Sequence, residues 1–228
     1  MITENTKRKN GSIESLWVSA SIVIYAFCAL PPIVIGAQIL ALLPPAPAAV
    51  ALSFLVLTGF FFFLFLLILV CGFLHLLMPL PQEGEFPLLR EGQVRRWMAH
   101  TSVVNLLRVP GFIRWIFAIR FLRSLYFRLS GARIHPSATI SYEALLPDPF
   151  LLEIGEGAEI GNWVKISAHF VDRDKFLIKR IHIGKNAIIG ANSVILAGAV
   201  IGDNAVIPPG SLILPGTVVP DGEAWSGR

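Results

Sequence analysis

Formal charge is missing from a long stretch near the N-terminus: residues 15–82 contain no Asp, Glu, Lys or Arg over 68 positions. Two apolar runs, residues 16–43 and 48–78, lie inside this stretch on either side of the segment PPAPA. Each run exceeds the roughly 20 apolar residues that cross a bilayer core as a helix, and the second run excludes a cleaved signal peptide. We therefore expect a two-helix transmembrane hairpin over residues 15–82, kinked at Pro31 and Pro32.

Cysteine is also scarce, and its distribution excludes several kinds of chemistry. The only two, Cys28 and Cys71, fall inside the apolar runs, so no disulfide framework is implied. Because no cysteine follows residue 71, thiolate catalysis and cysteine-ligated metal sites are excluded from the rest of the chain. The serines lack the surroundings of a nucleophile elbow.

Acidic residues are rare in the next segment, residues 83–130, where eight Arg and one Glu lie between positions 88 and 130. Aromatic residues are interleaved with the arginines, a pattern typical of basic amphipathic helices on a membrane surface. We expect such helices here, broken near Pro110-Gly111, with membrane lipids as their partner. Nucleic-acid binding is disfavoured because the segment directly follows a predicted span.

Basic residues flank both spans, whereas the loop between the spans has no charge. Since positive flanks stay cytoplasmic, we expect the tail of residues 1–14, both termini and the segment 131–228 on the cytoplasmic side, in a multi-pass protein of the bacterial cytoplasmic (inner) membrane. The flanking residues are Lys7, Arg8, Lys9, Arg90, Arg95 and Arg96.

The last part of the chain repeats every six residues from residue 183 onward. A period of six places successive aliphatic residues on the same side of an extended chain, fits the helical period poorly and indicates stacked repeats. The repeat predicts a parallel β-helix over residues 131–228, with aliphatic residues inside and glycine or asparagine at corners that need positive φ. The corner candidates are Gly184, Gly190, Gly198, Gly202, Gly210, Gly216, Gly222, Asn186, Asn192 and Asn204.

Upstream of residue 183 the same repeat is interrupted twice. The register slips by two between Leu146 and Ile154, and the pattern stops after Asp172 until Ile183. We interpret the intervening RDKFLIKRIH as a loop that leaves the coil, and such insertions often carry function. Its cations are Lys175, Lys179 and Arg180. We interpret them either as contacts for the phosphates of an acyl donor or as a run of charges in contact with solvent.

Among the five histidines, His169 is the candidate for chemistry because it lies in the last unit, ISAHFV, before this loop. Histidine titrates near neutrality and suits a general base. Asp172 and Asp174 follow closely and either orient the imidazole or are solvated acids. A polar coil residue bonded to the backbone is the alternative interpretation of His169, and His182 is expected on a coil face.

Ile-Gly-x-Asn-Ala-x units after a broken coil containing Ser-Ala-His resemble the hexapeptide-repeat acyltransferases. The resemblance implies a left-handed parallel β-helix, usually trimeric, with His169 as the base. Trp225-Ser226-Gly227 resembles the start of the family's closing segment, and we expect Asn192 and Trp225 on the side of the acyl donor. The usual Val-Trp-Ile-Gly reads AIIG here, so a donor contact by that Trp is missing.

The whole layout is also similar to the C-terminal membrane module of poly-lysine-synthetase-like nonribosomal peptide synthetases, which implies amide formation from a pantetheine thioester. The hypothesis is a membrane-anchored acyltransferase that uses acyl-CoA or an acyl-phosphopantetheine carrier protein, with no permanently bound cofactor or metal. Two alternatives remain. One is a metal lyase similar to β-helix carbonic anhydrases, with His169, His182 and His135 as ligands. The other is a non-enzymatic membrane scaffold.

Overall fold

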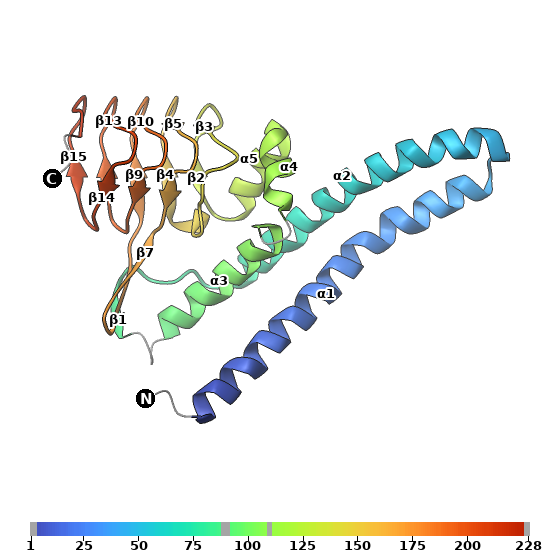
Figure 1. Ribbon diagram of the computed structural model, residues 1–228, viewed down its shortest axis with the longest axis horizontal. Helices are drawn as coiled ribbons and strands as arrows, with labels where there is room; N and C mark the ends of the chain where they lie inside the picture. The colour runs from blue at the N-terminus through green and yellow to red at the C-terminus, as the bar shows by residue number, and fades with distance from the viewer. Residues whose placement is uncertain (1–3, 88–91, 109–110, 226–228) are drawn as a thin grey trace. The chain divides into compact units, whose positions relative to one another are not determined.

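A computed structural model describes residues 4–87, 92–108 and 111–225. Their contacts divide the chain into two compact units, Met1–Val70 and Cys71–Arg228. The first unit holds the first apolar helix and most of the second, and the second unit holds the end of that helix, the shorter helices and the coil of repeats (Figure 1).

Two long apolar helices, α1 (Glu4–Ala41) and α2 (Pro45–Leu77), form a hairpin joined by a turn at residues 42–44. They contain segments of 25 and 28 residues, Trp17–Ala41 and Val50–Leu77, that are long and apolar enough to cross a membrane. In the most apolar part of each segment, only 6% and 22% of the residues are buried. Helix α1 continues through Pro31 and Pro32. It begins at Glu4, inside the segment 1–14 that was predicted as an N-terminal tail.

Three shorter helices follow, α3 (Gly92–Arg108), α4 (Phe112–Ala118) and α5 (Arg120–Leu129). The break predicted near Pro110-Gly111 is present, because α3 ends at Arg108 and Gly111 takes a left-handed φ of 79° before α4; Pro110 itself lies outside the described residues. A second break at Ile119, which is extended, separates α4 from α5. These helices bury one apolar face and leave Trp115 and Phe121 more than half exposed.

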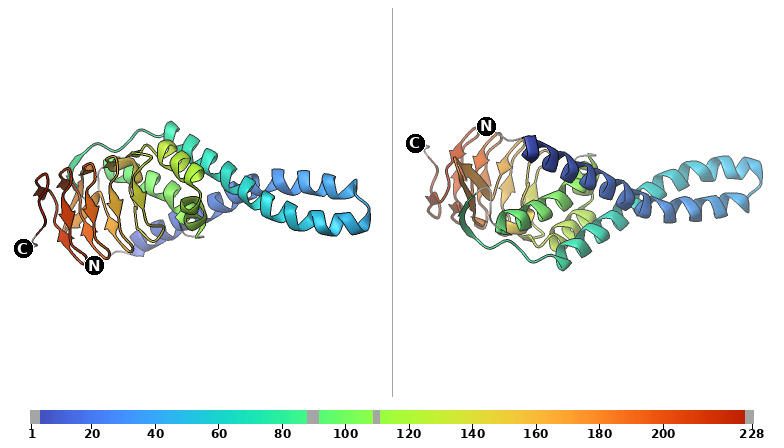
Figure 2. Two further views of the ribbon diagram at one scale, coloured as in Figure 1. Left: turned by 90° about the horizontal axis from the view of Figure 1, so that it is seen from above. Right: turned by 90° about the horizontal axis from the view of Figure 1, so that it is seen from below.

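The repeats form a coil of three parallel sheets, seen as the yellow-to-red strands that stack in chain order in Figures 1 and 2. The first sheet, in spatial order, contains β15 (Val218–Val219), β12 (Val200–Ile201), β9 (Ile181–Ile183), β4 (Leu152–Ile154) and β2 (Arg133–Ile134). The second contains β13 (Val206–Ile207), β10 (Ile188–Ile189), β5 (Glu159–Ile160) and β3 (Thr139–Ile140). The third contains β14 (Leu212–Ile213), β11 (Val194–Ile195) and β6 (Lys165–Ile166).

The predicted β-helix of hexapeptide repeats is therefore confirmed. In the regular part each residue pairs with the one 18 positions further along, such as Ile188 with Val206, so one coil equals three repeats. The aliphatic residue that opens each regular unit is at most 2% exposed. Burying each such side chain stabilises the fold by about 1.5–3 kcal/mol relative to leaving it in water. These residues are Ile183, Ile189, Ile195, Ile201, Ile207, Ile213 and Val219.

The corners use two physically different kinds of residue. The glycines three places after the opening aliphatic residue have left-handed φ values of 70–77°, as predicted; they are Gly198, Gly210, Gly216 and Gly222. Asn186, Asn192 and Asn204 have left-handed φ values of 51–60°, as predicted. The glycines at Gly184, Gly190 and Gly202 were also predicted to provide positive φ, but they do not have it. They are required instead because the next coil passes too close for a Cβ atom.

Gly184 tests this explanation. A Cβ atom on Gly184 would lie 2.6 Å from the backbone of Gly202 and Asp203, and backbone atoms cannot move aside without shifting a whole coil. We expect Gly184→Ala to lower the free energy of unfolding by about 1–3 kcal/mol, the usual cost of overpacking. Thermal unfolding of the purified full-length protein in detergent measures the change.

Gly210→Asn is the matched control for this test. Gly210 occupies the corner one coil after Asn192, has a φ of 75° and would place a Cβ atom in open space. Because asparagine already occupies this corner in the coil below, the change should stay within about 0.5 kcal/mol. Equal destabilisation by both substitutions would contradict the close-approach explanation for Gly184.

Candidate active site

The chain leaves the coil at His169 as a β-hairpin. Strands β7 (His169–Asp172) and β8 (Lys175–Ile178) pair antiparallel, with Arg173 at a φ of 55° in the turn. The interpretation of RDKFLIKRIH as a loop was therefore wrong in its conformation, although the segment does project from the coil (Figure 1). A third strand, β1 (Gly84–Pro87), pairs with β8 and extends the hairpin into a small sheet. The sequence could not reveal this pairing, because β1 lies far upstream in the chain.

His169 begins this hairpin and contacts a buried carboxylate. Its Nδ1 lies 2.6 Å from Oδ2 of Asp148, whose side chain is completely buried, while the side chain of His169 is 23% exposed. The same Oδ2 accepts a hydrogen bond from the backbone N–H of Ala168 at 3.0 Å. The indole Nε1–H of Trp97 donates to the other oxygen at 2.7 Å. Because both oxygens have donors, the buried carboxylate is satisfied and held in place.

Asp148 reaches this position through the irregularity in the first coils. The chain leaves the repeat after Leu146, forms the short 3₁₀ helix η1 (Pro149–Leu151) and returns at β4. The carbonyl of Asp148 accepts a hydrogen bond from Leu151 N at 3.0 Å, and Phe150 anchors the turn in the core with no exposed surface. The two-residue slip in the sequence repeat thus corresponds to the loop that carries Asp148.

Aromatic rings enclose the imidazole of His169. The ring centroid of Trp97, on α3, lies 4.4 Å from that of His169, and the centroid of Phe176, on β8, lies 5.8 Å away at a nearly parallel 13°. Within the described residues Nε2 of His169 makes no hydrogen bond. The network favours the tautomer with the proton on Nδ1, donating to Asp148, which leaves a lone pair on Nε2.

The acids predicted beside His169 lie elsewhere. Asp172 ends β7 in register with Lys175, and Asp174 lies in the hairpin turn; both are exposed. An extended strand separates Asp172 from His169 by about 10 Å. In this chain the carboxylate that contacts the imidazole is Asp148, which sequence reasoning did not consider.

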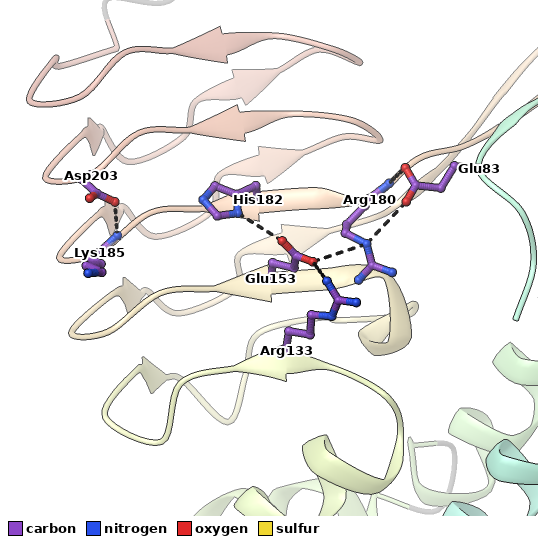
Figure 3. A network of polar contacts seen from close by, with 7 residues as sticks. All are labelled: Glu83, Arg133, Glu153, Arg180, His182, Lys185 and Asp203. Carbon is purple, nitrogen blue, oxygen red and sulfur yellow. Dashed lines mark hydrogen bonds and ion pairs between the residues drawn. The ribbon is translucent and has the colours of Figure 1, made fainter.

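The predicted phosphate-binding cations have partners or structural contacts within the chain. Lys175 forms an ion pair of 2.6 Å with Glu85, and this hydrogen bond and charge raise the pKa of Lys175. Arg180 lies between Glu83 and Glu153, at 3.4 and 3.6 Å from its Nε (Figure 3). Lys179 is exposed and extends its methylene groups over Gly198.

His182 belongs to a separate polar network on the outer face of the first sheet, as Figure 3 shows. Its Nδ1 lies 3.4 Å from Oε2 of Glu153, and Arg133 forms a 2.6 Å ion pair with the same carboxylate. Burial raises the pKa of Glu153, but the hydrogen bonds from Arg133 and His182 and the charge of Arg180 outweigh burial and hold it below its usual value. The prediction that His182 lies on a coil face is confirmed.

Asn192 and Trp225 take structural positions at the coil. Asn192 is a left-handed corner whose N–H donates to Asn162 at 2.9 Å. The backbone N–H of Trp225 donates to the carbonyl of Val206 at 2.8 Å, which extends the coil beyond its last named strand. The other two residues of the predicted closing segment, Ser226 and Gly227, lie outside the described residues.

A buried histidine pair was not foreseen either. Nδ1 of His75, at the end of α2, lies 2.7 Å from Nδ1 of His100 on α3, so one ring donates to the other. Phe150 packs against both rings. Burial lowers the pKa of His100, although its contact with the carbonyl of Pro79 opposes this effect. No sequence pattern links positions 25 residues apart on two different helices.

Comparisons with known proteins agree with this coil. The family described as bacterial transferase hexapeptide (six repeats) matches residues 180–219. A hexapeptide-repeat acetyltransferase from Vibrio cholerae is 18% identical with a TM-score of 0.40, covering 52% of this chain and 84% of its own. Its complex with acetyl coenzyme A is 14% identical with a TM-score of 0.38, covering 57% and 82%.

A serine acetyltransferase from Neisseria gonorrhoeae in complex with serine is 24% identical with a TM-score of 0.28, covering 58% of this chain and 54% of its own. This chain therefore spans about half the length of that enzyme. A search of curated proteins finds no match. The match over residues 180–219 confirms the resemblance of the coil to hexapeptide-repeat proteins at the level of the repeat.

Proposed function

We propose that this protein is a membrane-anchored acyltransferase in which His169 is the general base. The observation that carries the proposal is the pair formed by His169 and the fully buried Asp148 at the start of a hairpin that interrupts the coil. A buried carboxylate on Nδ1 fixes the imidazole and leaves a lone pair on Nε2, which is the arrangement of a base and its orienting group.

In the proposed reaction Nε2 of His169 removes a proton from an acceptor amine or hydroxyl. The acceptor nitrogen or oxygen attacks the carbonyl carbon of a thioester and forms the new C–N or C–O bond. Collapse of the tetrahedral intermediate breaks the C–S bond, and the imidazolium returns its proton to the departing thiolate. Asp148 stabilises the positive charge on the imidazole between these two steps.

The donor in this proposal is the thioester of a pantetheine group, on coenzyme A or on a carrier protein. The transferase repeat family and the acetyl coenzyme A bound to the Vibrio cholerae neighbour agree with this donor. The cations of the segment RDKFLIKRIH stay proposed donor contacts, together with Asn192 and Trp225; these cations are Lys175, Lys179 and Arg180. Asp172 and Asp174 stay proposed contacts for a cationic acceptor.

The test of this function is the release of free thiol from acetyl-CoA by the purified full-length protein in detergent. Amino acids, amino-lipids and sugars are supplied in turn as acceptors, because each class offers an amine or a hydroxyl. Thiol release that depends on one acceptor class, with the acylated acceptor identified by mass, supports the proposal. If no acceptor accelerates thiol release and the purified protein contains bound metal, the metal-lyase alternative is favoured instead.

We also propose that the protein assembles as a homotrimer, with an active site in each groove between the β-helices of neighbouring subunits. The sheet faces carry exposed aliphatic side chains, which a partner would cover. They include Ile188, Leu212, Leu214 and Val218, with exposed fractions of 43–63%.

Membrane insertion through α1 and α2 is part of the proposal, since both helices are long and apolar and expose most of their surface. The basic flanks then place the coil in the cytoplasm. We expect Glu223→Cys, exposed on the last coil, to resist an impermeant thiol reagent in intact cells and to react after lysis. The native Cys28 and Cys71 are 0% and 3% exposed and should contribute little signal.

Leu42→Cys is the control for this experiment. Leu42 lies in the turn between the two apolar helices and is 84% exposed, so the proposed topology places it on the outer side. It should react in intact cells. The reverse pattern, with Glu223→Cys labelled and Leu42→Cys protected, would invert the orientation.

A further inference from the structure

A cavity of about 810 Å³ lies between α5 and the first two corners of the coil, away from the residues that surround His169. Four cationic side chains line it, against the single carboxylate of Glu156. Three of the cations come from neighbouring parts of the chain, on α5 and β2, and the fold adds a fourth from a corner of the coil much further along the sequence. They are Arg123 and Arg128 on α5, Arg133 on β2, and Lys185 at the corner after β9.

The charges of this cavity are largely uncompensated. Arg133 is neutralised by its 2.6 Å ion pair with Glu153, and Figure 3 shows its guanidinium turned toward that carboxylate. Arg123, Arg128 and Lys185 form no ion pair with any side chain in the part of the chain that the structure describes. Burial, followed by the neighbouring charge of Arg120, lowers the pKa of Arg123, as expected for a cation that lacks a counter-ion. An anion in the cavity would relieve this electrostatic cost.

Apolar side chains share the cavity with these cations. Phe121 and Leu125 on α5 line it together with Ile134 and Pro136 of the first coil, and Phe121 is 64% exposed. A small soluble phosphate would use the cations and leave the apolar wall in water. A lipid with an anionic headgroup matches both surfaces, because its phosphate meets the cations while its chain covers the apolar residues.

We propose that this cavity binds the headgroup of an anionic phospholipid, with the phosphate between Arg123, Arg128 and Lys185 and the start of the acyl chains along Phe121 and Leu125. The site would give the protein a preference for anionic lipid that two apolar spans alone do not provide. It is independent of the acyl-transfer proposal, because it uses none of the residues around His169 and its readout is binding rather than turnover.

Native mass spectrometry of the full-length protein in neutral detergent tests the site. Phosphatidylglycerol and phosphatidylcholine with the same acyl chains are titrated separately, and phosphatidylglycerol should bind at least about 10-fold more tightly. The double variant Arg123→Gln, Lys185→Gln should weaken phosphatidylglycerol binding by about 25-fold, since each cation near a lipid phosphate contributes about 5-fold. Arg128→Gln, at an exposed position, should weaken it by about 5-fold without disturbing the core.

Arg120→Gln is the matched control, because Arg120 lies on the same helix but does not line the cavity. It removes the same charge from the chain and should change binding by less than about twofold. Equal affinity for the two lipids, or equal loss in the cavity variants and the control, would overturn the proposal. Displacement of phosphatidylglycerol by inorganic phosphate or coenzyme A at equal concentration would also overturn it, since the site would then serve a soluble phosphate.

Discussion

His169→Ala is expected to lower kcat for acyl transfer from acetyl-CoA by about 10²–10⁴-fold, the usual contribution of a positioned acid or base. The substitution removes the imidazole whose Nε2 is the proposed base. KM for acetyl-CoA should change little, because the lost interaction belongs to the transition state rather than to donor binding. Thiol release under saturating donor, with the acceptor class that proves active, gives both constants.

His182→Ala provides the control for general effects of removing an imidazole from the coil. His182 lies on the outer sheet face, bonded to Glu153, and should affect turnover only mildly. Metal content is measured on the same samples. If both variants lose activity to a similar, severe extent and release metal, the lyase alternative is correct and the acyltransferase proposal fails.

Periodic parts of the fold were predictable because their side chains repeat a physical requirement at fixed spacing. Each six-residue unit places one aliphatic residue inward, so Ile183, Ile201 and Ile207 identify the coil even without knowledge of the sheets. The asparagine corners followed from backbone sterics alone. Glycines such as Gly184 were located correctly but explained incorrectly, because the close approach of a neighbouring coil is a tertiary contact.

The candidate site was only half predictable for the same reason. His169 was identifiable because it lies where the repeat stops. Asp148 was within reach of the repeat logic: in the irregular coils Leu145 pairs with Lys165, an offset of 20 residues, and Asp148 contacts Ala168 at the same offset. A carboxylate one coil below the histidine could thus have been found by counting turns of the coil rather than neighbours in the chain.

Trp97 and the strand β1 lay beyond such reasoning. Both come from the segment before the coil, and nothing periodic relates α3 or residues 84–87 to the hairpin. Their contacts with Asp148 and with β8 result from how the segment folds back on the coil. The basic composition of residues 83–130 predicted a surface role for this segment, and its part in supporting His169 came only from the structure.

Asp148→Asn is the second substitution expected to have a large effect, with kcat falling by about 10²–10⁴-fold, the scale seen when the orienting carboxylate of a catalytic histidine is neutralised. The two carboxylate oxygens of Asp148 accept hydrogen bonds from Trp97, Ala168 and His169. An asparagine amide keeps only one acceptor oxygen and places an NH₂ donor where the other oxygen was. An amide NH₂ facing Nδ1 would donate to it and move the ring proton to Nε2, which removes the lone pair needed for the base. An NH₂ facing Trp97 would instead oppose a buried donor, at a cost of about 1–3 kcal/mol.

Asp172→Asn distinguishes this explanation from the sequence-based assignment. Asp172 is exposed at the end of β7, in register with Lys175, so neutralising it removes no hydrogen bond to the imidazole. We expect kcat to stay within about threefold of the unmodified protein, as for most surface substitutions, while a contact of Asp172 with a cationic acceptor would raise KM for that acceptor. Circular dichroism and thermal unfolding separate loss of folding from loss of turnover in Asp148→Asn. A folded Asp148→Asn with full activity, beside an inactive Asp172→Asn, would return the orienting role to the hairpin acids.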